Sequence, residues 1–365
     1  MVENFLRPWG ESAQPYGSKK SVMAEESDVS IGDDTEREAA MLTAARSVVR
    51  TCMQVRPHEH VLVVTDPSTS EVGRSLYEVA SEVTDRILRM MMPRRHRQGN
   101  EPPASVGDLM RRQNVVLLAT RHSLTHTRAR LTASREGARI ASMPGIDEEM
   151  MAMGGMTADY NALQKEISGL NPMLRRRRDV RVTTPAGTDV TFRTGARWVL
   201  EDNGICNRPG QVTNLPAGKV FVLPKEQTLS GKIVIDGSWE GILLDETLTF
   251  LVEEGMVVSI SGGELAESVE SVLDEAKVGL RPSRAGLVKT VAEFGFGMNS
   301  RARMTGNRLE DQVVRGSAYF GIGDNSALGG SASVGIHMRG VMLKPTIELN
   351  DVDLVVDGKI TARKR

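Results

Sequence analysis

The stretch HVLVV at residues 60–64 is a short apolar run, and it predicts a buried strand. A second run of this kind, VVLLA at residues 115–119, predicts another. Around them, helix-like and strand-like segments alternate: helices at Glu36–Val55, Thr69–Val83, Ala104–Arg112 and Thr125–Glu136, and strands at Arg86–Met92 and Ala138–Ser142. This alternation predicts a mostly parallel sheet with helices on both faces.

Ligands of such sheets bind at the carboxyl ends of the strands. In this sequence the predicted ends are Thr65-Asp66-Pro67, Pro93, Thr120-Arg121-His122 and Ser142-Met143-Pro144-Gly145. A polar loop, RRHRQGNEPP, follows Pro93.

The composition changes after about Leu174. Two strand-like segments flank Pro185-Ala186-Gly187-Thr188 and predict a hairpin. The strands expected from here on are Asp179–Thr184, Asp189–Phe192, Lys219–Leu223, Lys232–Ile235, Leu248–Leu251 and Met256–Ile260, with one helix at Glu264–Ala276. The predicted fold class is therefore α/β, with a mostly parallel α/β domain at 36–174 and a β-rich α+β domain at 175–365 that carries the site. Residues 1–35 are polar and predict a flexible arm, with a protein-binding extension as the alternative.

The charge balance argues against a general nucleic-acid binder, because 46 Lys and Arg face 47 Asp and Glu. No apolar run is long enough to cross a bilayer, and the first 35 residues lack the apolar centre of a signal peptide. Cys52 and Cys206 are too few for a disulfide framework or a four-cysteine zinc site. These features predict a cytoplasmic globular protein without a membrane or nucleic-acid partner.

Common catalytic signatures are missing from the sequence: GxGxxG, Walker, HExxH and GxSxG patterns are all absent. His122 and His126 are four residues apart, but His122 is expected to precede the helix, so capping and polar contacts are favoured over a metal site. The run Arg175-Arg176-Arg177-Arg178 is typical of a solvated helix end, and phosphate binding is its less favoured alternative.

The most distinctive stretch runs from Glu293 to Pro345. Two strand-like pieces, SAYFGIG and IHMRGVML, are joined there by a Gly/Ser loop. Glu293, Tyr319 and His337 each lie in or beside an apolar strand, where an ionisable group needs a specific reason to be present.

Several long segments resemble the aminopeptidase T-like family, which comprises thermophilic metallo-aminopeptidases and relatives that include 2,5-dihydroxypyridine ring-cleaving dioxygenases. The resemblance extends from about Glu36 to Gly358. It rests on SLTHTRAR (123–130), GARIASMPGIDEEM (137–150), VTTPAGTDVTF (182–192), NLPAGKVFVLP (214–224), EFGFGMNSRARMTGNRLEDQ (293–312) and GIHMRGVMLKPT (335–346). The resemblance also implies a homodimer.

The resemblance implies a metal centre of two glutamates, two histidines and an aspartate. Of the five matching positions, only Glu293 and His337 keep a metal ligand. The remaining three are Lys219 in place of glutamate, Tyr319 in place of histidine and Arg339 in place of aspartate. Because Lys and Arg have no lone pair for a metal, we expect no metal cofactor; zinc or iron is expected only if this ligand argument fails.

The leading interpretation is a metal-independent, hydrolase-like enzyme that hydrolyses or rearranges an amide or ring in a small carboxylate-bearing substrate. The expected catalytic residues are Glu293, His337, Tyr319 and Lys219, and the expected substrate-binding residues are Arg339, Lys219 and His126. One alternative is a non-catalytic scaffold or partner subunit, in which Lys219–Glu293 and Arg339–Glu293 ion pairs replace metal bonds. The other is a single-metal hydrolase or ring-cleaving dioxygenase.

Overall fold

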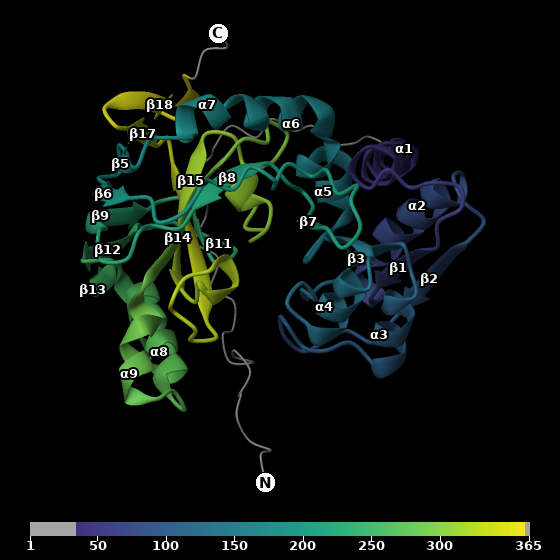
Figure 1. Cartoon of the computed structure of the whole chain (residues 1–365), viewed down its shortest axis with the longest axis horizontal. Coiled ribbons are helices and arrows are strands. Elements are labelled where there is room, and N and C mark those ends of the chain that lie inside the picture. Colours follow the sequence, from purple (N-terminus) through teal and green to yellow (C-terminus); the bar gives the residue numbers. More distant parts are fainter. Residues whose placement is uncertain (1–33, 362–365) are drawn as a thin grey trace.

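The computed structural model describes residues 34–361, which fold into one parallel and two antiparallel sheets (Figure 1). The α-helices are α1 (Asp34–Arg46), α2 (Ser70–Ser81), α3 (Ala104–Arg111), α4 (Arg128–Arg135), α5 (Glu148–Met153), α6 (Tyr160–Gly169), α7 (Asn171–Leu174), α8 (Gly263–Lys277) and α9 (Pro282–Ala285). The strands of the parallel sheet are β1 (Val61–Thr65), β2 (Ile87–Met91), β3 (Val115–Ala119), β4 (Arg139–Ser142) and β7 (Val212–Asn214).

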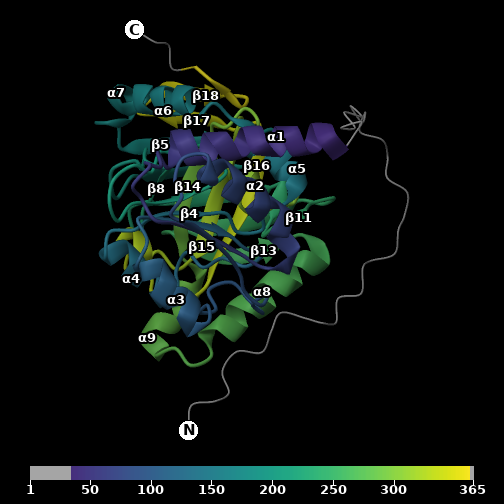
Figure 2. The ribbon, with the colours of Figure 1, turned by 90° about the vertical axis from the view of Figure 1, so that its right-hand side faces the viewer.

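The parallel sheet has the strand order β2-β1-β3-β4-β7. Alternate residues of the buried strand β1 contribute to two separate hydrophobic clusters, one with the side chains of α1 and α2 and one with those of α3 and α4. Helices therefore cover both faces of the sheet, as the alternating sequence predicts (Figure 1). In Figure 2, α1 lies across α2 and close to α5, and it packs against both.

The second half of the chain forms the antiparallel sheets. The six-stranded sheet comprises β8 (Lys219–Val222), β10 (Ser238–Trp239), β11 (Ile242–Leu243), β14 (Val291–Gly297), β15 (Ser317–Gly323) and β16 (His337–Leu343). The eight-stranded sheet comprises β5 (Asp179–Thr183), β6 (Asp189–Arg193), β9 (Ser230–Ile235), β12 (Leu248–Glu253), β13 (Met256–Ser261), β17 (Thr346–Leu349), β18 (Val352–Val356) and β19 (Lys359–Ile360). Aromatic rings pack between the two sheets: the ring centroids of Phe192 in β6 and Phe294 in β14 are 5.4 Å apart. The predicted α/β class with a β-rich second part is confirmed.

Some boundaries differ from the predictions. The helix expected at Glu36–Val55 is α1 followed by a π-helical segment, Ser47–Cys52. The helix expected from Thr125 begins at Arg128, because the Thr127 hydroxyl accepts a hydrogen bond from the amide of Arg130 and caps it. The predicted hairpin is confirmed by antiparallel pairing of β5 with β6.

Two features bear on the predicted domains and partners. β7 comes from beyond residue 174 and completes the parallel sheet, so that the two halves of the chain share this sheet; the division at 174 stays a prediction. The first 33 residues of the predicted arm lie outside the described residues. Among the residues described, no helix is both long and apolar enough to cross a membrane.

Candidate functional site

The site is built on one face of the six-stranded sheet, where side chains and glycines alternate. In β14, Phe294 and Phe296 point into the apolar core, so Glu293, Gly295 and Gly297 share the opposite face. In β15, Tyr319, Gly321 and Gly323 alternate in the same way with Phe320 and Ile322. The sequence of each strand therefore places one polar side chain beside glycines.

The glycines leave the space that the polar side chains fill. Strand register sets Glu293 opposite Gly321, and Gly321 opposite Arg339 of β16. A Cβ at Gly321 would lie 2.7 Å from His337 Nε2, and one at Gly295 would lie 2.6 Å from the Tyr319 ring. Any larger residue at these two glycines would push the site side chains apart.

Glu293 is the centre of the site, and its side chain is 1% exposed. Tyr319 Oη donates a hydrogen bond of 2.5 Å to Glu293 Oε1. Arg339 donates to Oε2 from Nη2 at 2.9 Å and from Nε at 3.3 Å, and His337 Nε2 lies 3.4 Å from the same oxygen. Both carboxylate oxygens therefore have protein partners.

The charges around Glu293 decide its protonation. Burial acts to raise the pKa of Glu293, but the Arg339 charge, the contact with His337 and the Lys219 charge outweigh it and hold this pKa well below its usual range. Burial and the neighbouring Glu293 charge hold the pKa of Tyr319 well above its usual value. Glu293 is therefore a carboxylate at neutral pH, and Tyr319 is a neutral donor to it.

Lys219, at the start of β8, has its own buried partners. Its Nζ donates to Gln312 Oε1 at 2.9 Å and lies 3.6 Å from Asp202 Oδ2. It also lies 5.2 Å from the centre of the Tyr319 ring, which is a cation–π distance. Burial lowers the pKa of Lys219, and the Arg339 charge lowers it further, while the Asp202 charge acts in the opposite direction.

A third ion pair lies at the edge of the site. Arg308 Nη1 is 3.1 Å from Glu240 Oε2, and Arg308 Nη2 donates to the carbonyl of His337 at 2.8 Å. Glu240 also accepts a hydrogen bond of 2.6 Å from the amide of Arg339. Three cations, Lys219, Arg308 and Arg339, are thus matched by three carboxylates, and the charge of this network is compensated.

His126 reaches the same region from the parallel-sheet half of the chain, where it precedes α4. Burial lowers the pKa of His126, and the positive charges of Arg130, Arg339, His337 and Arg308 lower it further. The structure therefore brings Lys219, Glu293, Tyr319, His337 and Arg339 together, while His126 lies near enough for the charges of Arg339 and His337 to act on it. The charges that act on His122 are instead those of Arg94, Arg121, Asp66 and His96.

Sequence reasoning missed four residues of this network: Asp202, Glu240, Arg308 and Gln312. Arg308 and Gln312 lie within the distinctive segment 293–312, which was a usable signal. Asp202 and Glu240 lie in loops between strands, and no pattern in the sequence connects them to Lys219 or Arg339. The expected Lys219–Glu293 ion pair is replaced by Lys219–Asp202.

The donor set at this face does not fit a metal ion. Lys219 and Arg339 have no lone pair to offer, Tyr319 gives its hydrogen to Glu293, and Glu293 already accepts from two side chains. Nowhere within residues 34–361 do three His, Cys, Asp or Glu side chains gather so that they could hold a metal. The residues present at this face therefore differ in chemistry from the metal ligands that the family resemblance implies.

The loop between β14 and β15 ties the site to the parallel-sheet half. Glu310 Oε1 accepts hydrogen bonds from the amide of Gly155 at 2.6 Å and from the amide of Arg303 at 3.2 Å. Two residues further on, Gln312 holds Lys219. Burial, the largest cause, and the charges of Asp147 and Asp311 together raise the pKa of Glu310 to about 7, although the two amides act against them.

Glu310→Gln is expected to stabilise the protein at pH 8 and to have little effect near pH 4.5. The pKa of Glu310 is higher in the folded than in the unfolded protein, so ionisation of Glu310 destabilises the fold. This destabilisation is complete above pH 7 and is absent below the unfolded pKa. Each unit of pKa difference corresponds to about 1.4 kcal/mol, so the destabilisation is at most about 3 kcal/mol. Glutamine keeps an oxygen acceptor for the two amides without the charge. Urea unfolding at both pH values measures the effect, with the exposed Glu267→Gln as control; equal stability of Glu310→Gln and wild type at pH 8 would contradict it.

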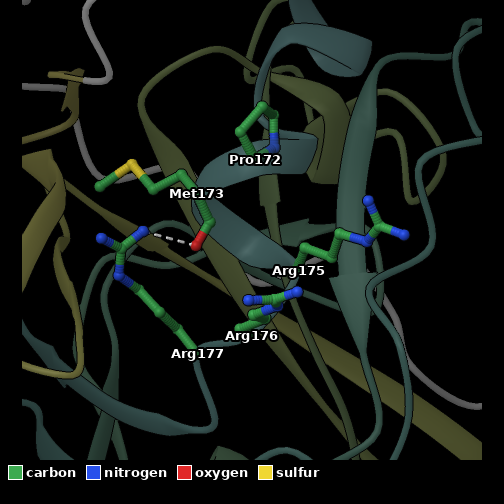
Figure 3. A pocket seen from close by; sticks show the side chains of 5 residues that line it. All are labelled: Pro172, Met173, Arg175, Arg176 and Arg177. Atoms are coloured by element: carbon green, nitrogen blue, oxygen red, sulfur yellow. Dashed lines mark hydrogen bonds between the residues drawn. The ribbon is translucent and has the colours of Figure 1, made fainter.

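The arginine run at the junction adopts the helix-end arrangement. Arg177 Nη1 donates a hydrogen bond of 2.7 Å to the carbonyl of Met173 in α7, as Figure 3 shows. Pro172, Met173, Arg175 and Arg176 line a shallow hollow of about 400 Å³ beside it. This hollow does not share residues with the network around Glu293.

Comparisons with known proteins agree with this architecture. The family model described as 2,5-dihydroxypyridine 5,6-dioxygenase matches residues 40–362. A curated protein of that name from Pseudomonas putida is 25% identical over 214 residues, which are 54% of this chain and 59% of that protein. The match therefore spans less than two thirds of the relative's length.

Two solved structures share the fold. The structure of 2,5-dihydroxypyridine dioxygenase from Pseudomonas putida KT2440 has a TM-score of 0.74 at 18% identity and covers 90% of this chain and 98% of that one. Wild-type AmpT from Thermus thermophilus has a TM-score of 0.62 at 14% identity, with coverages of 89% and 99%. With the family model matching nearly its whole length, this chain belongs to the 2,5-dihydroxypyridine 5,6-dioxygenase family, and it shares its fold with AmpT.

Proposed function

We propose that this protein is a metal-independent member of its family and that it acts as a non-catalytic scaffold or partner subunit. The observation that carries this proposal is the pairing of buried Glu293, one oxygen of which accepts from Tyr319 and the other from Arg339. A metal or a substrate proton would have to compete with Arg339 and Tyr319 for these buried oxygens. The ion pairs would then stabilise the fold at the positions that the family resemblance assigns to metal ligands.

The pairing of Lys219 supports the same conclusion. An amine acts as a nucleophile only when it is neutral and accessible. Lys219 is almost fully buried and shares its donors between Gln312 and Asp202. The catalytic roles expected for Lys219, Glu293 and Tyr319 are therefore less well supported than structural roles.

A second candidate is the metal-independent enzyme that acts on a small carboxylate-bearing molecule. It is favoured by the outer edge of the network, where the side chains of Arg339 and His337 are 24% and 19% exposed. Arg339 uses Nε and Nη2 for Glu293, and within the described chain Nη1 forms no hydrogen bond. With His126 alongside, this edge could hold a carboxylate and exchange a proton with it.

The two candidates differ in one measurable property. Succinate added to ¹³C-labelled protein should leave the imidazole signals of His126 and His337 unchanged if the site is only structural. Saturable shifts at both histidines that disappear in Arg339→Gln, but not in the distant Arg112→Gln, would favour the enzyme. Thermal unfolding of each variant shows whether it retains the native fold, and the same titration at constant ionic strength removes the general effect of salt.

Metal dependence is tested separately by elemental analysis, on protein purified without chelator and then dialysed against zinc, iron and manganese. The proposal expects less than about 0.1 equivalent of each metal, because an ammonium and a guanidinium stand where ligands are needed. Close to one equivalent would overturn it. That result would favour the remaining alternative, a single-metal hydrolase or ring-cleaving dioxygenase. Glu293 and His337 would then be the first ligands to test by substitution.

Three expectations remain part of the proposal. The homodimer follows from the family resemblance, and sedimentation of the purified chain measures it. A protein partner that binds through residues 1–35 would be lost on deletion of residues 1–33. The cytoplasmic location is checked by fractionating cells that express the protein.

A further inference from the structure

The carboxyl edge of the parallel sheet carries a second group of charged residues, outside the network around Glu293. The chain runs from β1 outward to β2 and then returns past β1 to β3, so the strand order reverses between β1 and β3. Open α/β sheets bind ligands at such a reversal, beyond the carboxyl ends of the strands. Here the three ends are followed by Asp66, by Arg94-Arg95-His96 and by Arg121-His122.

His122 shows that these residues gather in space. Burial lowers the pKa of His122, and the positive charges of Arg94, Arg121 and His96 lower it further, while Asp66 acts in the opposite direction. Groups from all three strand ends therefore lie close enough to His122 to affect its charge.

The one carboxylate in this group is already occupied. Asp66 Oδ1 accepts from the amide and the hydroxyl of Ser68 at 2.9 and 2.6 Å, and Oδ2 accepts from the amide of Arg121 at 2.6 Å. Asp66 therefore holds the turn after β1 and the turn after β3 together. Neither the Arg94 nor the Arg121 guanidinium forms a hydrogen bond or ion pair with any residue in the range 34–361.

Two buried polar atoms in the segments that follow β2 and β3 also lack partners. His122 Nδ1 and Arg95 Nε are shielded from solvent and make no hydrogen bond with the described part of the chain. Buried polar atoms are normally satisfied, and these two orphans follow β2 and β3, the strands on either side of β1, where a ligand bound beyond the strand ends would supply partners.

The loop that carries the arginines is fixed against the end of β3. The amide of Gly99 donates to the carbonyl of Ser123 at 2.9 Å, and the amide of Ser123 donates to Gln98 Oε1 at 2.5 Å. The segments bearing Arg94 and Arg121 are therefore held in place before any ligand binds, which reduces the entropy lost on binding.

We propose that Arg94, Arg95, Arg121 and His122 form a binding site for the phosphate group of a small phosphorylated molecule. Three arginines and one aspartate leave an excess of two positive charges, and a phosphate monoester carries about −1.5 to −2 at pH 7. Guanidinium groups bind phosphate oxygens in pairs of parallel hydrogen bonds. The site uses no residue of the network around Glu293, so it goes beyond the function proposed above.

The test is a titration of the full chain with inorganic phosphate, followed by calorimetry and by the NMR signals of the His122 imidazole. We expect saturable binding that shifts His122, and a dissociation constant at least about tenfold weaker in Arg94→Gln/Arg121→Gln. Arg112→Gln, an exposed arginine at the end of α3, is the matched control and should bind like wild type. Arg339→Gln should also bind normally, which separates this result from the fate of the proposed function.

Three results would overturn the phosphate site. They are no saturable binding by wild type, equal affinity in Arg94→Gln/Arg121→Gln and wild type, and binding of succinate as tight as that of phosphate at the same ionic strength. The substituted arginines are exposed, and thermal unfolding checks that the variants fold. The His122 shift in wild-type protein tests the site without any substitution.

Discussion

Arg339→Met is expected to lower the free energy of unfolding by about 3 to 5 kcal/mol, the range for removing one partner of a buried ion pair. The substitution leaves Glu293, at 1% exposure, with Tyr319 as its remaining strong donor. Methionine retains much of the packing volume of arginine, so the loss reflects charge more than a cavity. Urea unfolding at pH 7 measures the change.

A double-mutant cycle isolates the pair. Adding Glu293→Gln removes the stranded charge and should recover a large part of the stability, because replacing both partners of a buried pair costs far less than replacing one. The exposed pair Arg181–Asp189 is the control, and Arg181→Met should cost less than about 1 kcal/mol. A cost for Arg339→Met no greater than that of Arg181→Met would show that the network does not stabilise the fold.

The pH dependence of Arg339→Met gives an independent check. In wild type the pKa of Glu293 is held below its unfolded value, so its charge stabilises the fold above the unfolded pKa and this stabilisation is lost as pH falls through the folded pKa. Without Arg339, burial dominates and raises the pKa of Glu293. The difference in stability between variant and wild type should therefore shrink on acidification from pH 7 to pH 4.

The triple variant Lys219→Glu/Tyr319→His/Arg339→Asp is expected to gain a zinc site. It restores two carboxylates and one imidazole beside Glu293 and His337, all of which are zinc ligands, and it removes both cations. The glycine-lined face that accommodates Tyr319 and His337 in wild type has room for the introduced glutamate, histidine and aspartate, each of which is smaller than the side chain it replaces. Elemental analysis after dialysis against zinc should change from less than about 0.1 equivalent in wild type to about one in the variant.

The matched control removes the charges without adding ligands. Lys219→Gln/Tyr319→Phe/Arg339→Gln should bind no zinc although its pocket has also lost both cations. Zinc uptake by this control would mean that Glu293 and His337 bind metal without the restored ligands. Failure of the triple variant to bind zinc, with its fold intact, would show that the five positions do not converge on one metal.

Much of the architecture could be predicted from local sequence. The apolar runs at 60–64 and 115–119 gave β1 and β3, because a strand buried on both faces must be continuously apolar. Segments separated by Pro185-Ala186-Gly187-Thr188 gave the hairpin of β5 and β6. The π-helical turn after α1 was missed, since local propensities do not distinguish it from an α-helix.

The sequence alone determined which face of the sheet is polar and which residues of the family's ligand set are changed. Alternation in EFGFG and YFGIG places Glu293 and Tyr319 beside glycines, and the substitutions at Lys219, Tyr319 and Arg339 are visible in a single chain. Only the tertiary structure decided which charges are paired. Asp202 and Glu240 reach Lys219 and Arg339 from loops in other parts of the chain, and Gln312 lies 93 residues from Lys219. Pairing of buried charges depends on distances of a few ångströms between such remote segments, and these distances are set by the packing of the whole fold.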